Sequence, residues 1–305
     1  MHNHYQKVNN QKRFRTIVRS FKLKATSATT RWSWSISPSL TKRLVQRSFF
    51  KPVPFVLPKE RLSLLDDARY FTLTIKSGKK RIAFWHWGNG PAILLIHGWG
   101  GQGIQFYNLI QRLRQEGFSV ITFDKPAHGF SSGKTTNVFE FIETTQAVFQ
   151  HELKIKGILA HSMGAVSALW ITQNNPLPLV LIAPIFNLTK GLVQWSSQFG
   201  IEEKIILNTL RNLEKKHSLS LDEISPDQVA AKCNSPTMVI HDKFDKVTSA
   251  SDSKKLAELL TNGQLLITED LGHNRILEDT QVISHSLVFF NRYSLNAPVS
   301  PLVYE

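Results

Sequence analysis

The sequence predicts an α/β fold in which a mostly parallel sheet of eight strands is covered by helices on both faces. From Tyr70 onward, short apolar runs typical of strands alternate with amphipathic stretches typical of helices. The run 92–96 is apolar throughout, as expected for a strand that is buried on both sides. Of the 305 residues, 42% are hydrophobic and 20% are charged, which allows one large core.

The strands are identified as short apolar runs bounded by turn residues. Ser77-Gly78-Lys79 joins the first two runs and is a hairpin signal, so these two strands are expected to be antiparallel. The later runs alternate with helices, which favours parallel pairing. The eight expected strands are 71–75, 82–87, 92–96, 120–123, 155–160, 179–183, 237–240 and 265–267.

Three helices are expected between the early strands, over 104–113, 138–153 and 164–171. The interval from about 185 to 234 interrupts the alternation with apolar residues at helical spacing, among them Trp195 and Phe199. An insertion between two strands at their carboxyl edge predicts a small helical lid. Trp195 and Phe199 are its candidate substrate contacts, although the same residues fit the internal packing of a lid equally well.

The N-terminal part differs in charge from the remainder. The net charge is +14, and residues 1–50 hold eleven Lys or Arg and no Asp or Glu. We expect residues 1–58 to be a basic segment, disordered at its start and with a short helix over 40–50, and residues 59–305 to be the folded domain. A solvated tail is the simplest interpretation; a basic amphipathic helix on an anionic membrane through residues 1–35 and an organellar transit peptide are alternatives.

Several protein classes are disfavoured by composition. The single cysteine, Cys233, excludes an internal disulfide and suits a reducing compartment, so we expect a cytoplasmic protein, with peripheral membrane attachment as the alternative. No apolar run approaches the roughly 20 residues of a membrane-spanning helix. The chain carries no zinc spacing or RNA-binding signature, so no nucleic-acid partner is expected, and the oligomeric state is open.

The stretch Ala160-His161-Ser162-Met163-Gly164 lies between an expected strand and an expected helix. It matches the nucleophile elbow G-x-S-x-G, with Ala160 in place of the first glycine. Such a turn needs small neighbours because it holds the serine in a strained conformation that lifts the hydroxyl above the sheet edge. Alone the pattern is weak, and its place after a buried strand strengthens it.

A second glycine-rich stretch, His97-Gly98-Trp99-Gly100-Gly101, follows the third strand. With the elbow, it resembles the α/β-hydrolase superfamily, whose H-G-x loop supplies an oxyanion donor. The resemblance implies that the backbone N–H groups of Trp99 and Met163 form the oxyanion hole. A phosphate-binding loop is the alternative, but no Lys-Ser/Thr pair completes it.

Three further motifs carry the resemblance, which spans about 71–290. The turn 124–131 resembles D-x-P-G-H-G-x-S and is interpreted as structural, with His128 as a rival base. The stretch 241–247 resembles H-G-x-x-D-x-x, which implies Asp245 as the triad acid; Asp242 replaces the glycine and is the runner-up. His273 follows the last strand after a glycine and is implied as the base, in the chain order of this fold.

The resemblance implies a serine hydrolase that cleaves carboxylic ester or related acyl bonds through Ser162, Asp245 and His273. The expected partner is a small ester or acyl substrate, and neither a metal nor an organic cofactor is implied. An acyltransferase or a C–C hydrolase with the same triad is an alternative, because pocket shape selects the acceptor. A non-catalytic binding protein that kept the fold is another.

Overall fold

The structure is a computed structural model that describes residues 37, 49–53, 58–152, 154–198 and 200–294. Its contacts divide the chain into two units, one of Met1–Phe50 with Thr189–Ser220 and the other of Lys51–Leu188 with Leu221–Glu305. Of the helix expected over 40–50, only Phe49 and Phe50 belong to the described residues. The basic segment 1–35 lies outside them.

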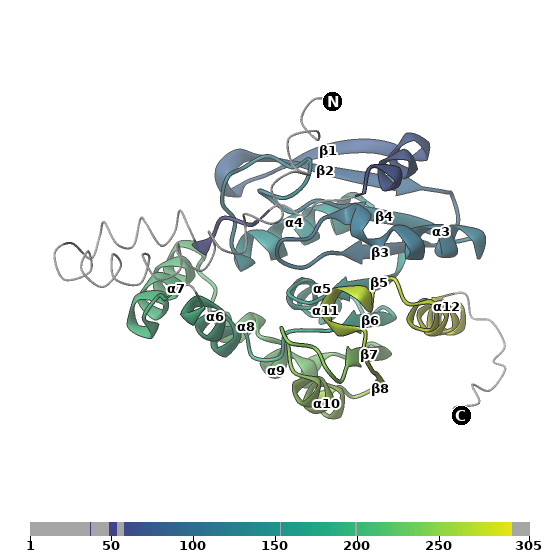
Figure 1. The fold of residues 1–305 in the computed structure, drawn as a ribbon. Coiled ribbons are helices and arrows are strands. Elements are labelled where there is room, and N and C mark those ends of the chain that lie inside the picture. Colours follow the sequence, from purple (N-terminus) through teal and green to yellow (C-terminus); the bar gives the residue numbers. More distant parts are fainter. Residues whose placement is uncertain (1–36, 38–48, 54–57, 153, 199, 295–305) are drawn as a thin grey trace. The chain divides into compact units, whose positions relative to one another are not determined.

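The larger unit is built on one eight-stranded sheet, which confirms the predicted fold class (Figure 1). The strand order is β1-β2-β4-β3-β5-β6-β7-β8. β1 pairs antiparallel with β2, as the hairpin signal predicts, and β2 is also antiparallel to β4; the remaining pairs are parallel. The bounds are β1 Arg69–Ile75, β2 Lys80–Trp87, β3 Ala92–Ile96, β4 Ser119–Phe123, β5 Ile155–His161, β6 Leu179–Ile182, β7 Thr237–Asp242 and β8 Gly263–Thr268.

Alternate side chains of the central strands enter two separate apolar clusters, one on each face of the sheet. In β3, Ile93 and Leu95 belong to one cluster, and Leu94 and Ile96 belong to the other. This alternation follows from the two-residue period of a strand, and burial on both faces explains the unbroken apolar run.

Helices cover both faces (Figure 1). One face packs against the 3-10 helix Lys59–Asp67, α3 (Tyr107–Gln115) and α12 (Thr280–Ser294). The other packs against α4 (Val138–His151), α5 (Gly164–Thr172) and α10 (Ala250–Leu259). The helix expected over 104–113 is divided, because a 3-10 turn, Gly103–Phe106, precedes α3 and its first N–H donates to the Asp124 carboxylate.

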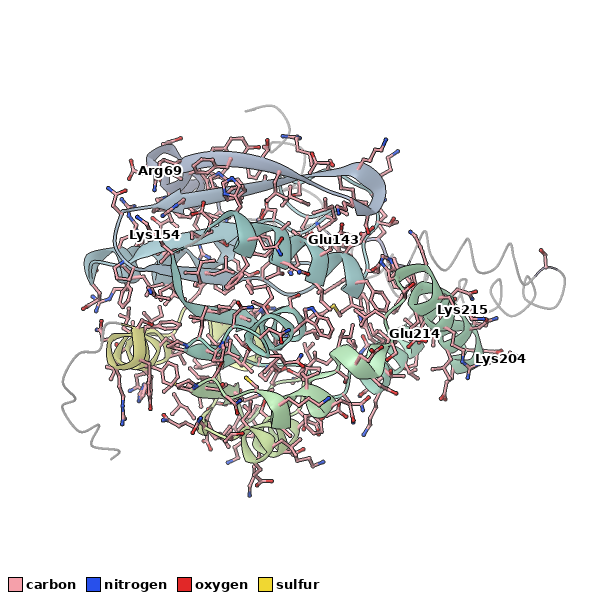
Figure 2. All side chains as sticks on the ribbon, turned by 180° about the vertical axis from the view of Figure 1, so that it is seen from behind. Arg69, Glu143, Lys154, Lys204, Glu214 and Lys215 are labelled. Carbon is pink, nitrogen blue, oxygen red and sulfur yellow. The ribbon has the colours of Figure 1, made fainter. Side chains whose placement is uncertain are left out.

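Among the described residues, four α-helices and one 3-10 helix lie between β6 and β7: α6 (Leu188–Ser197), α7 (Glu203–His217), α8 (Leu221–Ile224), α9 (Pro226–Val229) and the 3-10 helix Ala230–Lys232. α7 is amphipathic, and its polar side carries Lys204, Glu214 and Lys215 (Figure 2). Within the larger unit, Ser225 Oγ accepts the Leu188 N–H at 2.9 Å and Asp227 Oδ2 accepts from Asn187 Nδ2 at 2.7 Å. These bonds tie together the two points at which the chain leaves and re-enters this unit.

No helix among the described residues has both the length and the apolar character needed to cross a membrane.

Candidate active site

Ser162 occupies the turn between β5 and α5, and its backbone has the strained geometry of an elbow. Its φ is 54°, in the left-handed region that costs a residue with a Cβ about 1–2 kcal/mol. The Ser162 N–H donates to the Ile182 carbonyl of the neighbouring strand at 2.9 Å, and the preceding Ala160 is fully buried. The turn is therefore held by the sheet, and its position at a strand-to-helix junction is the one that the motif predicts.

Glycine is required where the glycine-rich loop after β3 meets the elbow. A Cβ on Gly98 would lie 2.9 Å from the Ser162 Cβ, 3.0 Å from the His161 oxygen and 3.4 Å from the Met163 nitrogen. A Cβ on Gly164 would lie 2.6 Å from the Ile96 oxygen. The segments that carry Trp99 and Met163, the expected oxyanion donors, are thus in van der Waals contact beside Ser162.

His273 connects Ser162 to Asp245 by two hydrogen bonds. Its Nε2 lies 3.0 Å from Ser162 Oγ, and its Nδ1 lies 2.7 Å from Asp245 Oδ2. The distances fit a serine hydroxyl that donates to Nε2 and an Nδ1–H that donates to the carboxylate. Ser162 and Asp245 follow the ends of β5 and β7, and His273 lies in the short helix α11 (Gly272–Arg275) beyond β8. The structure thus brings together the three side chains that the sequence singles out.

The carboxylate of Asp245 is fully buried and held by several donors. Oδ1 accepts the N–H groups of Val247 at 2.7 Å and Thr248 at 3.2 Å, and Oδ2 accepts the Thr248 hydroxyl at 3.0 Å. The imidazole of His241 also faces Oδ2, at 3.4 Å. Burial alone would raise the pKa of Asp245, but the hydrogen bonds from His241, His273 and the Val247 N–H hold that pKa well below its usual range.

The rival candidates have other partners. Asp242 is fully buried, and its carboxylate accepts from Phe244, Thr268 and Leu271 rather than from His273. His128 accepts the Gly100 N–H at Nε2 and contacts the Pro126 carbonyl through Nδ1, and burial lowers its pKa to about 4. A neutral imidazole occupied on both nitrogens is suited to holding the loop.

The 124–131 turn is fastened by its first residue. Asp124 Oδ1 accepts the Gly103 N–H and Oδ2 accepts the Phe130 N–H, both at 2.7 Å. Asp124 thereby joins the turn to the start of the segment that leads into α3, which agrees with its interpretation as structural.

Three residues around the triad are not singled out by the sequence analysis. His161 Nε2 contacts the His273 carbonyl at 2.9 Å, so the elbow also supports the loop of the base, and burial lowers the pKa of His161 to about 3. Thr248 and His241 contact Asp245 as described above. Thr248 lies two residues before α10, whose N-cap is Ser249, and no sequence motif marks it as a partner of the acid.

Trp195, one of the two lid candidates, belongs to the smaller unit. Trp195 packs its ring against Phe49 at a centroid distance of 4.6 Å, within the smaller unit. Phe199 lies outside the described residues. The lid, its extent of about 185–234 and these two contacts therefore stay predictions.

No group of three His, Cys, Asp or Glu in the described part of the chain is arranged to hold a metal ion.

The α/β-hydrolase fold model matches residues 91–198. The magnesium-chelatase 30 kDa subunit of Rhodobacter capsulatus is 32% identical over 97 residues, which are 30% of this chain and 34% of that subunit. Lipase 3 of Moraxella sp. (strain TA144) is 24% identical over 259 residues, which are 70% of this chain and 81% of the lipase.

The chain thus spans about a third of the length of the chelatase subunit that it matches. Among solved structures, an esterase of Pyrococcus furiosus superposes with a TM-score of 0.58 at 17% identity, covering 80% of this chain and 97% of that one. The family model lies over β3 to α6 and includes both the glycine-rich loop and the elbow. Together, the sheet order and these matches show that the chain has the α/β-hydrolase fold, and that its residues 91–198 match the family model of that fold.

Proposed function

We propose that this protein hydrolyses carboxylic esters, with Ser162 as nucleophile, His273 as general base and acid, and Asp245 as the group that orients His273. One observation carries the proposal: a continuous line of hydrogen bonds from Ser162 Oγ through His273 to Asp245, at 3.0 and 2.7 Å. A hydroxyl within hydrogen-bond reach of an oriented imidazole is the arrangement that activates a serine.

In the first half of the reaction, Ser162 Oγ bonds to the ester carbonyl carbon as His273 Nε2 takes the hydroxyl proton. The bond to the leaving alkoxide then breaks, and His273 returns that proton to it, which leaves an acyl group on Ser162. In the second half, His273 takes a proton from water as the water oxygen attacks the acyl carbon, and the acid departs as Ser162 regains its hydrogen.

The negative oxygen that forms at each attack is assigned to the backbone N–H groups of Trp99 and Met163. The close approach of Gly98 to Ser162 and Met163 supports this assignment, because a Cβ at position 98 would lie 2.9 Å from the Ser162 Cβ and 3.4 Å from the Met163 nitrogen. A donor of this kind is typically worth about 3–4 kcal/mol in the transition state. The buried, low-pKa carboxylate of Asp245 stabilises the imidazolium that His273 becomes.

The test is hydrolysis of p-nitrophenyl esters, from acetate to palmitate, by the full chain and by Ser162→Ala. We expect turnover in the native chain and none above background in the variant, whereas Ser63→Ala, which removes an exposed hydroxyl, should behave as the native chain. The chain length with the highest kcat/KM measures the acyl site. A fluorophosphonate should label the native chain and leave Ser162→Ala unlabelled.

The outcomes separate the alternatives. Ester product in place of acid when an alcohol is added would establish acyl transfer. A folded native chain that neither turns over any ester nor reacts with fluorophosphonate would contradict the proposal and favour the non-catalytic interpretation.

Two features outside the triad complete the proposal. We assign residues of the interval 185–234, including Trp195 and Phe199, to substrate selection. We assign residues 1–35 to reversible contact with an anionic membrane, on the strength of their unbalanced basic charge. A cytoplasmic location stays a prediction, which imaging of the tagged full chain would test.

A further inference from the structure

Asp242 connects the loop of the triad acid with the loop of the base. It ends β7, three residues before Asp245, and it is fully buried. Oδ1 accepts the Phe244 N–H at 3.0 Å, within the acid loop. Oδ2 accepts the hydroxyl of Thr268, the last residue of β8, and the Leu271 N–H in the loop that follows, both at 3.0 Å.

Every partner of this carboxylate is a hydrogen-bond donor. The Gly272 N–H also bonds to it, so two successive N–H groups immediately before His273 point at one anion. Burial raises the pKa of Asp242, but the hydrogen bonds from Leu271, Gly272 and Phe244 together lower it by more, so the net shift is downward. A buried anion matched by several donors is a strong anchor.

The turn that carries His273 needs an anchor of this kind. Asp270 and Gly272 both have positive φ, at 63° and 66°. Asp270 lacks the freedom of glycine, so its conformation costs about 1–2 kcal/mol and persists only where surrounding contacts impose it. The Leu271 N–H lies between these two residues, and the Asp242 carboxylate is its partner.

We propose that Asp242 is a positioning residue that holds the 268–272 turn so that His273 lies between Ser162 and Asp245. This rests on the proposed function of the triad. The α/β-hydrolase motif that this stretch resembles has glycine at this place, so the motif itself assigns no such role to Asp242. Its effect passes through backbone N–H groups, without contact with the reacting atoms.

A second bridge between the same two loops serves as the matched control. Lys243 Nζ and Glu269 Oε1 lie 2.7 Å apart, but their side chains are 55% and 57% exposed. An exposed ion pair contributes little to either stability or geometry. Glu269→Gln therefore removes a charge from the same turn without touching the buried anchor.

The experiment compares the full-length native chain with Asp242→Ala, Asp242→Asn and Glu269→Gln. The readouts are kcat and KM on the best p-nitrophenyl ester, the fluorophosphonate labelling rate, and the low-field proton NMR signal of the His273–Asp245 hydrogen bond, assigned by its loss in His273→Ala. The NMR signal reports the position of His273 without any turnover. Thermal unfolding verifies that each variant is folded.

We expect Asp242→Ala to lower kcat and the labelling rate about 10- to 100-fold, because a displacement near 1 Å has effects of that size, with KM changed less than about twofold. Its low-field signal should broaden or vanish through exchange with water. Asp242→Asn keeps one acceptor oxygen but presents an amide to the remaining donors, so its losses should be intermediate. Glu269→Gln should match the native chain in all readouts.

If Asp242→Ala does not fold, Asp242→Asn decides. A folded Asp242 variant that retains native kcat, labelling rate and NMR signal would overturn the positioning role. Equal losses in Glu269→Gln would also overturn it, because they would show a general sensitivity of the turn. An inert native chain would instead refute the proposed function, and the NMR comparison would still test the anchor.

Discussion

At the scale of single residues, the candidate site depends on a backbone approach at Gly98 that leaves no space for a Cβ atom. Gly98 lies against the Cβ of Ser162 and the carbonyl of His161. Its φ is not in the left-handed region, so the requirement for glycine is one of space rather than of backbone freedom. The loop that bears Trp99 can approach the nucleophile only because position 98 has no side chain.

Gly98→Ala should therefore impair chemistry by moving the loop of Trp99 away from the elbow. The added methyl group would lie 2.9 Å from the Ser162 Cβ, and the loss of one oxyanion donor should lower kcat about 10²- to 10³-fold. The measurement is kcat on the preferred ester, normalised to folded protein. Gly263→Ala is the control: its Cβ would lie 2.3 Å from the Ala257 oxygen, so it should lower stability by about 1–3 kcal/mol and leave kcat unchanged. A native kcat in Gly98→Ala would contradict this assignment.

At the scale of elements, neutral buried histidines join the loops at the carboxyl ends of the strands. His128 accepts the Gly100 N–H from the loop after β3, and its pKa is lowered to about 4 chiefly by burial. The folded state thus binds this proton less readily than the unfolded state, whose histidine has a pKa near 6.5. The resulting stability is present above that pKa and is lost as the pH falls toward 4.

His128→Gln should make the free energy of unfolding less dependent on pH. Between about pH 7 and pH 4, the free energy of unfolding should fall by about 3 kcal/mol more in the unmutated chain than in the variant. The reason is that the unfolded form of the unmutated chain gains a proton on His128, whereas the variant has no histidine there. Urea unfolding at a series of pH values measures this difference. Parallel curves for the native chain and His128→Gln would show that His128 is not the source.

The elements themselves follow closely from sequence patterns. All eight strands lie where apolar runs predict them. Strands such as β3 are buried on both faces, so nearly all their residues are apolar and the run is visible in the sequence. The order of the strands was not predicted, since no single strand's pattern reveals its neighbour. α12 was not predicted either, because its polar residues weaken the apolar stripe that packs on the sheet.

The candidate triad could be inferred as a set because motif order reflects topology. The supporting contacts could not be inferred from the sequence. Asp242 was considered only as a competing acid, and its hydrogen bond with the Leu271 N–H depends on how the loops after β7 and β8 are positioned in space. Likewise, nothing in the elbow motif indicates that His161 contacts the carbonyl of His273. Such contacts are set by tertiary geometry rather than by local spacing.

At the scale of the whole molecule, charge is divided unevenly along the chain. Residues 1–35 hold eight Lys or Arg and no acidic residue, whereas the remainder beyond residue 50 has 26 basic and 23 acidic residues. Because the charge beyond residue 50 is nearly balanced, we expect a negatively charged partner to bind residues 1–35 rather than the rest of the chain. Each basic residue near an anionic membrane contributes about 1 kcal/mol, and the attraction falls with salt.

Deletion of residues 1–35 should abolish binding to vesicles that contain anionic lipid. The full chain should sediment with such vesicles at low salt, less so at high salt, and not with neutral vesicles. Ester hydrolysis in solution should be unchanged by the deletion. Equal vesicle binding by the truncated chain would show that the contact lies elsewhere.

The paired bonds at Leu188 and Asn187, which join the chain's exit from the larger unit to residues 225 and 227 near its return, have an evolutionary consequence. Every group assigned to bond making and breaking lies within that unit, and the excursion Thr189–Ser220 supplies none of them. Because these bonds join the two ends of the excursion, the residues between them can be lengthened, shortened or replaced without disturbing the larger unit. Substrate preference can therefore change in evolution through exchange of this one segment, while the residues assigned to the reaction stay the same.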